Sequence, residues 1–308
     1  MKFFTSAIFF SLAVGVAGLA QTAYPVVVKH DAGETRLSSR AGKIVVLGAI
    51  SLEVALSLGI QPVGYGSVPP YIPENAEIGK PISALPMYSK LIKTMPVLVG
   101  SPSDPSLDAI RTLDPDLIVS DSRFAELNTK LDDIAPVLAF NFSSAGVSAR
   151  ALEALATATS RQRQAQEVKR NLERSVNINK PLVQGVVAKG KRMNIFFVTT
   201  DALFRGGPMS DTGRQLGSLG FEVVGVSKDS NIDKISLESL PLQRANIAMV
   251  LMSAVAPTAR KDRIMTLLKK SNITRLVRYD LRPDRLITGP ISEPLLLDEF
   301  AKLIRAVQ

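Results

Sequence analysis

The sequence predicts an α/β protein built from two Rossmann-like lobes that are joined by one long α-helix. Its 308 residues exceed what one hydrophobic core usually serves. Short β-branched runs alternate with helical patterns in both halves of the chain, which is typical of parallel strands joined by helical crossovers. A long helical pattern lies between the halves. We therefore expect a signal peptide at 1–20, an N-terminal extension at 21–42, an N-terminal lobe at 43–147, a linker helix at 148–180 and a C-terminal lobe at 181–308.

The first residues predict export from the cytoplasm. Lys2 precedes an apolar run from Phe3 to Leu19, and Gly18-Leu19-Ala20 offers the small residues that a signal peptidase accepts. A retained membrane anchor is the alternative interpretation. No Cys follows the run, so we expect no lipid anchor. The sequence thus indicates a cleaved signal peptide and a periplasmic location.

In the first half, apolar runs predict strands, and capped amphipathic segments predict helices between them. The run at 43–47 has the continuous apolar character of a strand covered on both faces. Ser51 is placed to cap a helix that ends before Gly59. Further strands are expected at 60–65, 97–99, 117–120 and 136–140, with helices at 106–113 and 125–134.

The linker helix is expected from about Ser148 to Val176, because this segment contains no Gly or Pro and its apolar residues recur every three or four positions. Strands at 193–199, 221–224, 247–252 and 275–279 and helices at 211–219, 235–242, 260–270 and 294–307 complete the second half. No second crossover between the lobes is visible in the sequence.

Composition excludes most metal and nucleophile chemistry. The chain has no Cys and one His, His30, so it cannot build a thiolate zinc site, an iron–sulfur cluster or a multi-His metal cage. Phosphate-loop, dinucleotide and nucleophile-elbow motifs are missing from their required contexts. The net charge of +9 suits an acidic ligand, and export argues against nucleic acid. We expect no cofactor.

Turns that follow strands are where α/β sheets bind ligands. Several of these turns carry Arg or Tyr, whose donors suit oxyanion groups on a ligand. Surface salt bridges explain the Arg residues equally well. The candidate ligand-binding residues are Tyr65, Arg123, Arg205, Arg282 and Arg285.

From about Lys43 to its end, the sequence resembles the periplasmic substrate-binding proteins of ABC importers for chelated iron. The resemblance rests on the order and spacing of several motifs. They are the segments at 43–64, 105–110 (PSLDAI), 113–118 (LDPDLI), 121–123 (DSR), 134–137 (IAPV) and 235–240 (ISLESL), together with the terminal helix.

This resemblance implies a monomer that captures a siderophore or ferric citrate between its lobes and delivers it to a membrane permease without turnover. Asp108 and Glu238 match the family's permease-docking acids, although both positions also suit helix capping. Arg123 matches an Arg of the ferric citrate branch. Ser101-Pro102-Ser103 lacks the Arg typical of the hydroxamate branch, whereas Asn141-Phe142-Ser143 resembles that branch.

Two alternatives stay open. The same fold binds haem or cobalamin, and haem would depend on ligation by a tyrosine, for which the candidates are Tyr65, Tyr71, Tyr88 and Tyr279. An exported enzyme that acts on an acidic small molecule is the alternative of another class. A chelate binder is favoured because Fe(III) saturated by its chelator needs no ligand from the protein.

Overall fold

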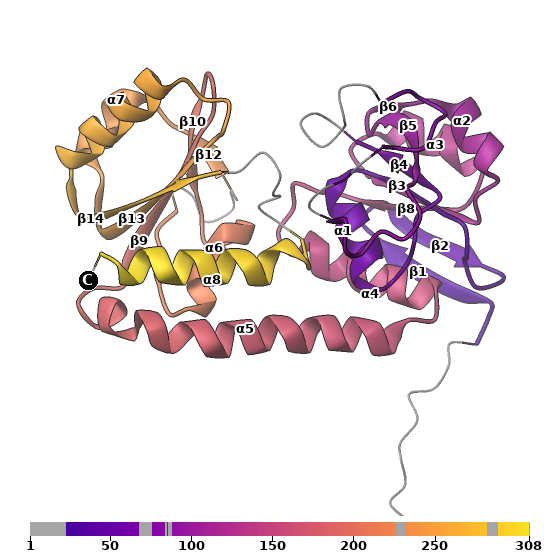
Figure 1. Ribbon diagram of the computed structural model, residues 1–308, viewed down its shortest axis with the longest axis horizontal. Coiled ribbons are helices and arrows are strands. Elements are labelled where there is room, and N and C mark those ends of the chain that lie inside the picture. The colour runs from indigo at the N-terminus through magenta and orange to yellow at the C-terminus, as the bar shows by residue number, and fades with distance from the viewer. Residues whose placement is uncertain are drawn as a thin grey trace, which may run out of the picture.

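The computed structural model describes residues 23–67, 76–83, 85, 88–225, 232–281 and 289–307. Two α/β lobes stand side by side, and helix α5 runs beneath both of them (Figure 1). Each lobe contains one six-stranded sheet with helices on its faces. The predicted fold class is therefore confirmed.

The N-terminal lobe has a sheet of strand order β6-β5-β4-β3-β7-β8, in which all neighbours are parallel except β5 and β6. Its central strands are apolar and fully buried, because helices cover both faces. The strands are β3 (Ile44–Leu47), β4 (Gly64–Gly66), β5 (Val97–Ser101), β6 (Asp104–Pro105), β7 (Leu117–Asp121) and β8 (Val137–Phe140). The helices are α1 (Ala49–Ser57), α2 (Leu107–Leu113), α3 (Ala125–Asp132) and α4 (Val147–Ala158).

A β-hairpin lies where the sequence predicted only an extension at 21–42. Strands β1 (Val26–His30) and β2 (Gly33–Leu37) pair antiparallel. The hairpin packs on β8, where the hydroxyl of Thr35 donates to the carbonyl of Val137 at 2.6 Å. Val28 and Leu37 are buried in the core of the lobe. The segment is therefore part of the N-terminal lobe.

The C-terminal lobe has a sheet of order β12-β10-β9-β13-β14, with β11 pairing the start of β9. Its parallel strands match the predicted ones, whereas antiparallel β10 and β12 were not predicted. The strands are β9 (Arg192–Val198), β10 (Leu203–Gly206), β11 (Glu222–Val223), β12 (Ile232–Lys234), β13 (Arg244–Met252) and β14 (Asn272–Asp280). The helices are α6 (Asp211–Ser218), the 3₁₀ helix η2 (Leu237–Leu242), α7 (Thr258–Lys269) and α8 (Ser292–Arg305).

The linker differs in detail from the single helix expected between Ser148 and Val176. Helix α4 ends at Ala158, and Ser160 adopts a left-handed φ of 54° before α5 begins. Helix α5 (Gln162–Ala188) then spans roughly 40 Å at about 1.5 Å per residue. It continues past the expected end at residue 180, and its last turns contribute Val183 and Val186 to the C-terminal core.

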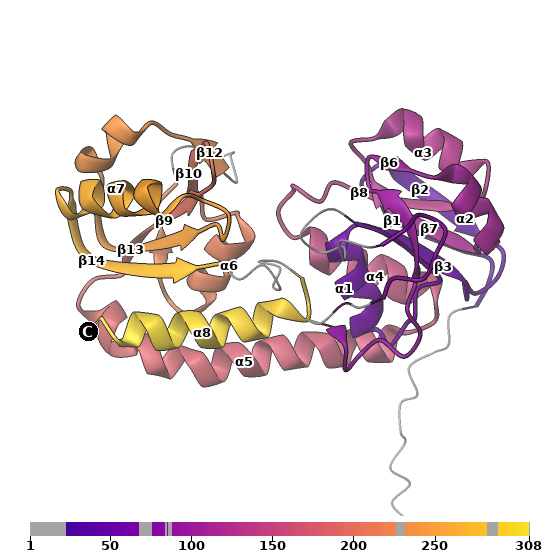
Figure 2. The same cartoon turned by 45° about the horizontal axis from the view of Figure 1, so that its top comes forward.

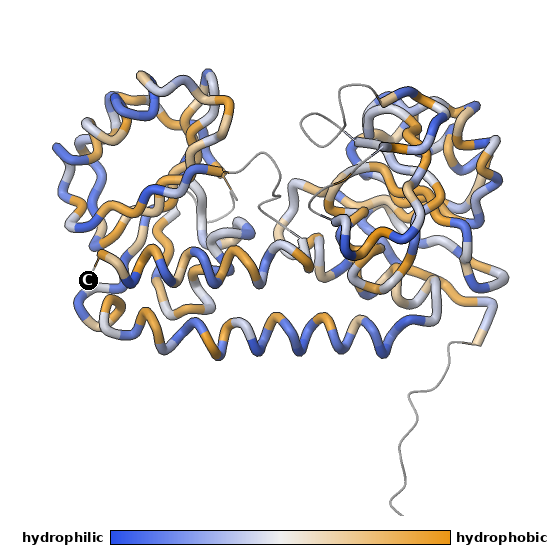
Figure 3. Tube along the Cα trace, in the orientation of Figure 1, coloured by the Kyte–Doolittle hydropathy of each residue, from blue (hydrophilic) through white to orange (hydrophobic). Residues whose placement is uncertain are grey.

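Apolar residues are concentrated in the strands of both lobes, whereas α5 alternates between polar and apolar residues (Figure 3). This alternation fits a helix that covers the protein with one face and meets solvent with the other. Helix α8 lies along α5 and buries Leu296, Phe300 and Ile304 in the C-terminal core. Among the helices that the structure describes, none combines the length and apolar character needed to cross a bilayer.

Candidate functional site

The candidate site is a pocket between the lobes, at the carboxyl-terminal side of the parallel strands. Both lobes contribute to it, and its volume is about 210 Å³. We refer to it as the cleft pocket. It is lined by Ser143, Ser144 and Ala145 from the segment after β8 and by Phe197, Met209, Ser210, Asp211 and Ile232 from the C-terminal lobe. The lobes face each other across this region (Figure 2).

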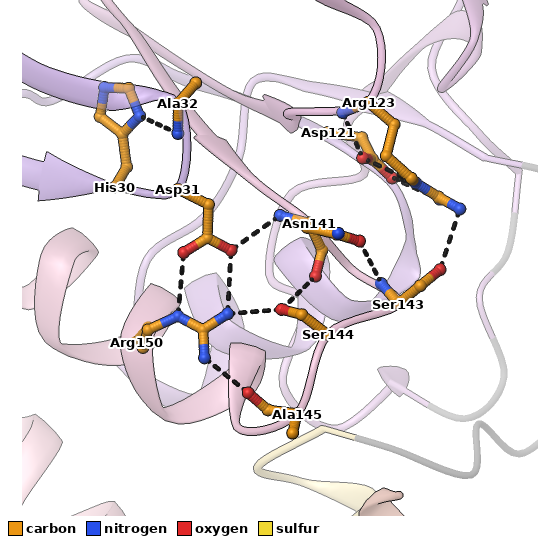
Figure 4. A network of polar contacts seen from close by, with 10 residues as sticks. All are labelled: His30, Asp31, Ala32, Asp121, Arg123, Asn141, Ser143, Ser144, Ala145 and Arg150. Carbon is orange, nitrogen blue, oxygen red and sulfur yellow. Dashed lines mark hydrogen bonds and ion pairs between the residues drawn. The ribbon is translucent and has the colours of Figure 1, made fainter. Parts of the chain in front are cut away.

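On the N-terminal side, the pocket is formed by residues 141–146, which connect β8 to α4. This segment is held by hydrogen bonds within itself. The amide of Ser143 donates to Oδ1 of Asn141 at 3.0 Å, and the hydroxyl of Ser144 donates to the backbone carbonyl of Asn141 at 2.8 Å. Two arginines hold it from opposite sides (Figure 4). We call residues 141–146, with these arginines and their carboxylate partners, the N-terminal wall.

Arg123 is the first of these arginines. Its Nε and Nη2 donate to Oδ1 and Oδ2 of Asp121 at 3.0 and 2.6 Å, and its Nη1 donates to the hydroxyl of Ser143 at 2.9 Å (Figure 4). The Asp121 side chain is 4% exposed, whereas half of the Arg123 side chain is exposed. Hydrogen bonding to Asp121 raises the pKa of Arg123. Arg123 therefore presents a charge-balanced guanidinium beside the pocket.

Arg150 is the second arginine, and sequence reasoning missed it. Helix α4 carries it, and its guanidinium forms a two-pronged ion pair with Asp31, in which both hydrogen bonds measure 2.9 Å (Figure 4). The same group donates to the carbonyl of Ala145 at 2.6 Å and to the hydroxyl of Ser144 at 2.5 Å. Hydrogen bonding by Arg150 lowers the pKa of Asp31. Its ion-pair partner, Asp31, lies in the turn of the β1–β2 hairpin, which the sequence did not predict. The sequence alone therefore gave no reason to select Arg150.

The C-terminal side of the pocket is formed by the start of α6. The hydroxyl of Ser210 caps the helix by accepting a hydrogen bond from the amide of Gly213 at 3.0 Å. Asp211 follows in the first turn, where it pairs with Arg214. Arg214 also donates to the carbonyl of Met209 at 3.0 Å. The pocket thus receives a hydroxyl and a paired carboxylate from this lobe.

Glu293 adds an unusual carboxyl group close to Asp211. It lies in the first turn of α8, and its pKa is raised to about 7, first by burial and then by repulsion from Asp211. Arg214 opposes this shift, and Glu53 from the other lobe adds to it. We call Ser210, Asp211, Arg214 and Glu293 the C-terminal wall. This wall changes its charge near neutral pH.

The residues predicted to bind ligand have different locations. Arg123 lies beside the pocket, as described above. Tyr65 is fully buried in the core of the N-terminal lobe, where its hydroxyl accepts a hydrogen bond from Ser67 at 2.6 Å. Arg205 is in β10 instead of the expected turn, and it donates to Oδ1 of Asn194 at 2.8 Å. Burial lowers the pKa of Arg205. Arg282 and Arg285 lie outside the described residues.

The two predicted docking acids are each in the first turn of a helix. Asp108 in α2 has a 95% exposed side chain and pairs with Arg111 at 3.1 Å. Glu238 in η2 is exposed, and hydrogen bonds from its own backbone amide and from Ser236 lower its pKa. Both side chains therefore lie on the surface of their lobes.

Protein ligands suited to a bare metal ion are not grouped in the described part of the chain, which has no cluster of three or more His, Cys, Asp or Glu residues able to hold one. His30, the single histidine, belongs to the β1–β2 hairpin and contacts Thr35 at 3.0 Å. Burial lowers its pKa.

Solved structures with the same fold cover nearly the whole chain. The structure of Staphylococcus aureus SirA complexed with staphyloferrin B superposes with a TM-score of 0.71 at 20% identity, over 91% of this chain and 98% of that one. The triscatecholate siderophore binding protein FeuA from Bacillus subtilis, complexed with ferri-bacillibactin, gives a TM-score of 0.70 at 17% identity over 91% and 98%. At these identities the likeness establishes the fold.

Sequence comparisons agree with this likeness. A putative ABC transporter substrate-binding lipoprotein of Bacillus subtilis (strain 168), YhfQ, is 33% identical over 122 residues. The match spans 38% of this chain and about a third of that relative's length, 34%. Residues 44–268, which include most of both lobes and the linker, match the periplasmic binding protein family. The chain is therefore a member of the periplasmic binding protein family.

Proposed function

We propose that this protein captures an Fe(III) chelate, either a siderophore or ferric citrate, between its lobes in the periplasm and delivers it to the permease of an ABC importer. The cleft pocket carries the proposal, because it presents hydroxyl groups from both lobes and a guanidinium beside them. These donors suit the outward oxygen atoms of a chelate whose metal is already saturated.

The composition of the chain supports a chelate over a bare metal ion as cargo. Binding naked Fe(III), zinc or manganese calls for several His or carboxylate ligands, and this sequence contains one His and no Cys. The complexes of SirA with staphyloferrin B and of FeuA with ferri-bacillibactin illustrate ligands that this fold accommodates.

Among the proposed ligand contacts, Arg123 has the best support. It lies beside the pocket, and half of its side chain is accessible to a ligand. Its bond to Ser143 directs one edge of the guanidinium towards the segment that lines the pocket. Arg282 and Arg285, which follow β14, remain proposed contacts. The fully buried position of Tyr65 and the hydrogen bond of Arg205 with Asn194 inside the C-terminal sheet lend no support to direct contact with ligand.

Delivery to a permease is proposed to use Asp108 and Glu238, one on each lobe. Both carboxylates are exposed, and each is at the start of a helix on the surface of its lobe. Exposed acids of this kind suit pairing with arginines on a partner protein. Export would be directed by the signal peptide proposed at residues 1–20, which is then cleaved.

Titration of intrinsic tyrosine fluorescence tests this function, since the chain has five Tyr and no Trp. Ferric citrate, ferric hydroxamate and catecholate chelates, haem and cobalamin would each be added to the purified protein. We expect saturable binding of one ferric chelate, with the ligand recovered chemically intact. Binding of haem or cobalamin alone, or conversion of the ligand to a product, would contradict the proposal.

Substitution of Arg123 by Ala is expected to weaken binding of the identified chelate by about 1–3 kcal/mol, or roughly five- to 150-fold, because a charged hydrogen-bond donor is removed. Arg170→Ala is the matched control, since Arg170 is exposed on α5. Equal affinities of the Arg123→Ala variant and the unmodified protein would remove Arg123 from the site.

A further inference from the structure

Glu53 is a fully buried carboxylate at the junction of the two lobes. It belongs to α1 of the N-terminal lobe and has 0% exposure. Its Oε2 accepts hydrogen bonds from the amides of Ile291 and Ser292 at 3.1 and 3.0 Å and from the Ser292 hydroxyl at 3.1 Å. Its Oε1 accepts one from the hydroxyl of Tyr88 at 3.0 Å. One carboxylate thus binds groups from two lobes.

The partners of Oε2 are the first amides of α8. Helix α8 receives no capping hydrogen bond from the side chain of its own N-cap residue, Ile291. Amides at a helix start lack partners within the helix, and the helix dipole favours a negative charge there. Glu53 therefore caps α8 from the opposite lobe. Figure 2 shows the start of α8 reaching the side of the molecule on which α1 lies.

Burial of this charge is costly unless hydrogen bonds compensate for it. Moving a carboxylate out of water costs several kcal/mol. Burial raises the pKa of Glu53, and its hydrogen bonds with Ser292, Tyr88 and Ile291 offset only part of this rise. Within the described residues, no Lys, Arg or His forms an ion pair with it. Three of its four hydrogen bonds come from Ile291 and Ser292, so separating the lobes would leave the carboxylate poorly compensated.

The approach between Glu53 and the other lobe is close. Gly289 has a φ of +147°, and a Cβ atom at this position would be 2.1 Å from Oε2 of Glu53. A side chain at position 289 would therefore push the carboxylate away. Ile291 packs against the N-terminal core, whereas Leu296 and Phe300 on the same helix are in the C-terminal core. The start of α8 is thus fixed to both lobes.

We propose that Glu53 is a positioning residue that pins the start of α8 to the N-terminal lobe and so sets the separation of the lobes before any ligand arrives. This second connection acts beside α5. It bears on the cleft pocket because α8 packs against α6, whose first turn carries Asp211 of the pocket lining. The role holds for any ligand, so it goes beyond the proposed function and is tested without a ligand.

Distances between spin labels on the two lobes test the role directly. The sequence contains no Cys, so Lys130→Cys on α3 and Lys269→Cys on α7 provide specific attachment sites at exposed positions. Double electron–electron resonance on the full chain is expected to give one narrow distribution of the distance between the two spin labels. Glu53→Gln retains the shape but removes the charge, and it should at least double the width. Glu173→Gln, at an exposed position of α5, is the control and should leave the width unchanged.

Two milder variants separate a positioning role from a role in folding the N-terminal lobe. Ser292→Ala removes one hydrogen bond between the lobes, and Tyr88→Phe removes one that lies within the N-terminal lobe. We expect Ser292→Ala to broaden the distribution and Tyr88→Phe to leave it narrow. If Glu53→Gln does not fold, the comparison of Ser292→Ala with Tyr88→Phe is sufficient to test the proposal. A narrow distribution in folded Glu53→Gln, or equal broadening by Ser292→Ala and Tyr88→Phe, would overturn the proposal.

Discussion

The two walls of the cleft handle charge in opposite ways. The N-terminal wall pairs each carboxylate with an arginine, Asp121 with Arg123 and Asp31 with Arg150, and the pKa of Asp31 is lowered as a result. The C-terminal wall places Asp211 and Glu293 around the single cation Arg214, and the pKa of Glu293 rises to about 7. Pairing with a cation favours the charged form of a carboxyl group, whereas partial burial beside another carboxylate disfavours it.

The two lobes therefore contribute different properties to one pocket. The N-terminal wall offers a fixed arrangement of hydroxyl groups held by guanidinium groups, so its hydrogen bonding does not depend on pH near neutrality. The C-terminal wall gains negative charge as the pH rises through about 7. An anionic chelate would meet greater repulsion there at high pH.

The largest expected effect comes from the turn that positions the C-terminal wall. A Cβ atom at Gly213 would lie 2.2 Å from the carbonyl oxygen of Gly207, which is backbone and cannot yield easily. Gly213→Ala should therefore lower the free energy of unfolding by about 2–4 kcal/mol, measured by urea denaturation with circular dichroism. Gly217→Ala in the same helix meets nothing within 4 Å and should instead stabilise by up to about 1 kcal/mol. Similar destabilisation by both would refute the steric explanation.

Titration of Glu293 is expected to give the next largest effect. Its pKa is about 7 in the folded protein and 4.5 ordinarily, so the folded state binds the proton more tightly than the unfolded state. The resulting stabilisation is complete below about pH 4.5 and is lost as the pH rises through about 7. Glu293→Gln should remove this dependence and stabilise the protein at pH 8 by about 1–3 kcal/mol, because the cost of charging a buried group disappears.

Denaturation curves at pH 5 and pH 8 check this prediction, with Glu173→Gln as a control at an exposed position of α5. The stability contribution of Asp31 changes with pH in the opposite direction. Because its pKa is lowered, Asp31 stabilises the folded state above its ordinary pKa of 3.8, and this stabilisation is lost as the pH falls below that value. Between pH 5 and 8, Asp31 should therefore not respond, whereas Glu293 should. His30, whose pKa is lowered from 6.5, and Glu53, whose pKa is raised, add contributions that are also present in Glu293→Gln, so the difference between the two proteins reports Glu293. A pH dependence that is the same in Glu293→Gln and in the unmodified protein would show that another group titrates.

The parallel strands were predictable because each is an apolar run bounded by turn residues. The run at 247–252 is fully buried within β13, and the run at 44–47 forms β3. A strand that is buried on both faces is apolar at every position, and this pattern is visible in the local sequence. The strands that were missed are antiparallel and partly exposed, and they carry polar residues; they are β1, β2, β6, β10 and β12. Their pairing depends on neighbours far along the chain.

The site was less predictable than the fold. Arg123 was identified because it follows a clear strand, but its pairing with Asp121 and Ser143 depends on the conformation of the turns after β7 and β8. Glu53 drew no prediction from the sequence, and its partner Ser292 is 239 residues away. Contacts of this range depend on how the lobes meet, and no local pattern encodes that arrangement.

The smallest expected effect concerns the N-terminal wall and shows what an exposed pair contributes when it is part of a network. Arg150→Ala should destabilise by about 1 kcal/mol, because Asp31, Ser144 and the carbonyl of Ala145 lose their partner, while the 43% exposure of Arg150 limits the cost. Arg163→Ala removes a simple pair with Glu167 from an 80% exposed side chain, so its effect should stay below about 0.5 kcal/mol. If the two variants lose the same stability, Arg150 contributes no more than an isolated surface pair, and the segment at 141–146 must be held by its own hydrogen bonds.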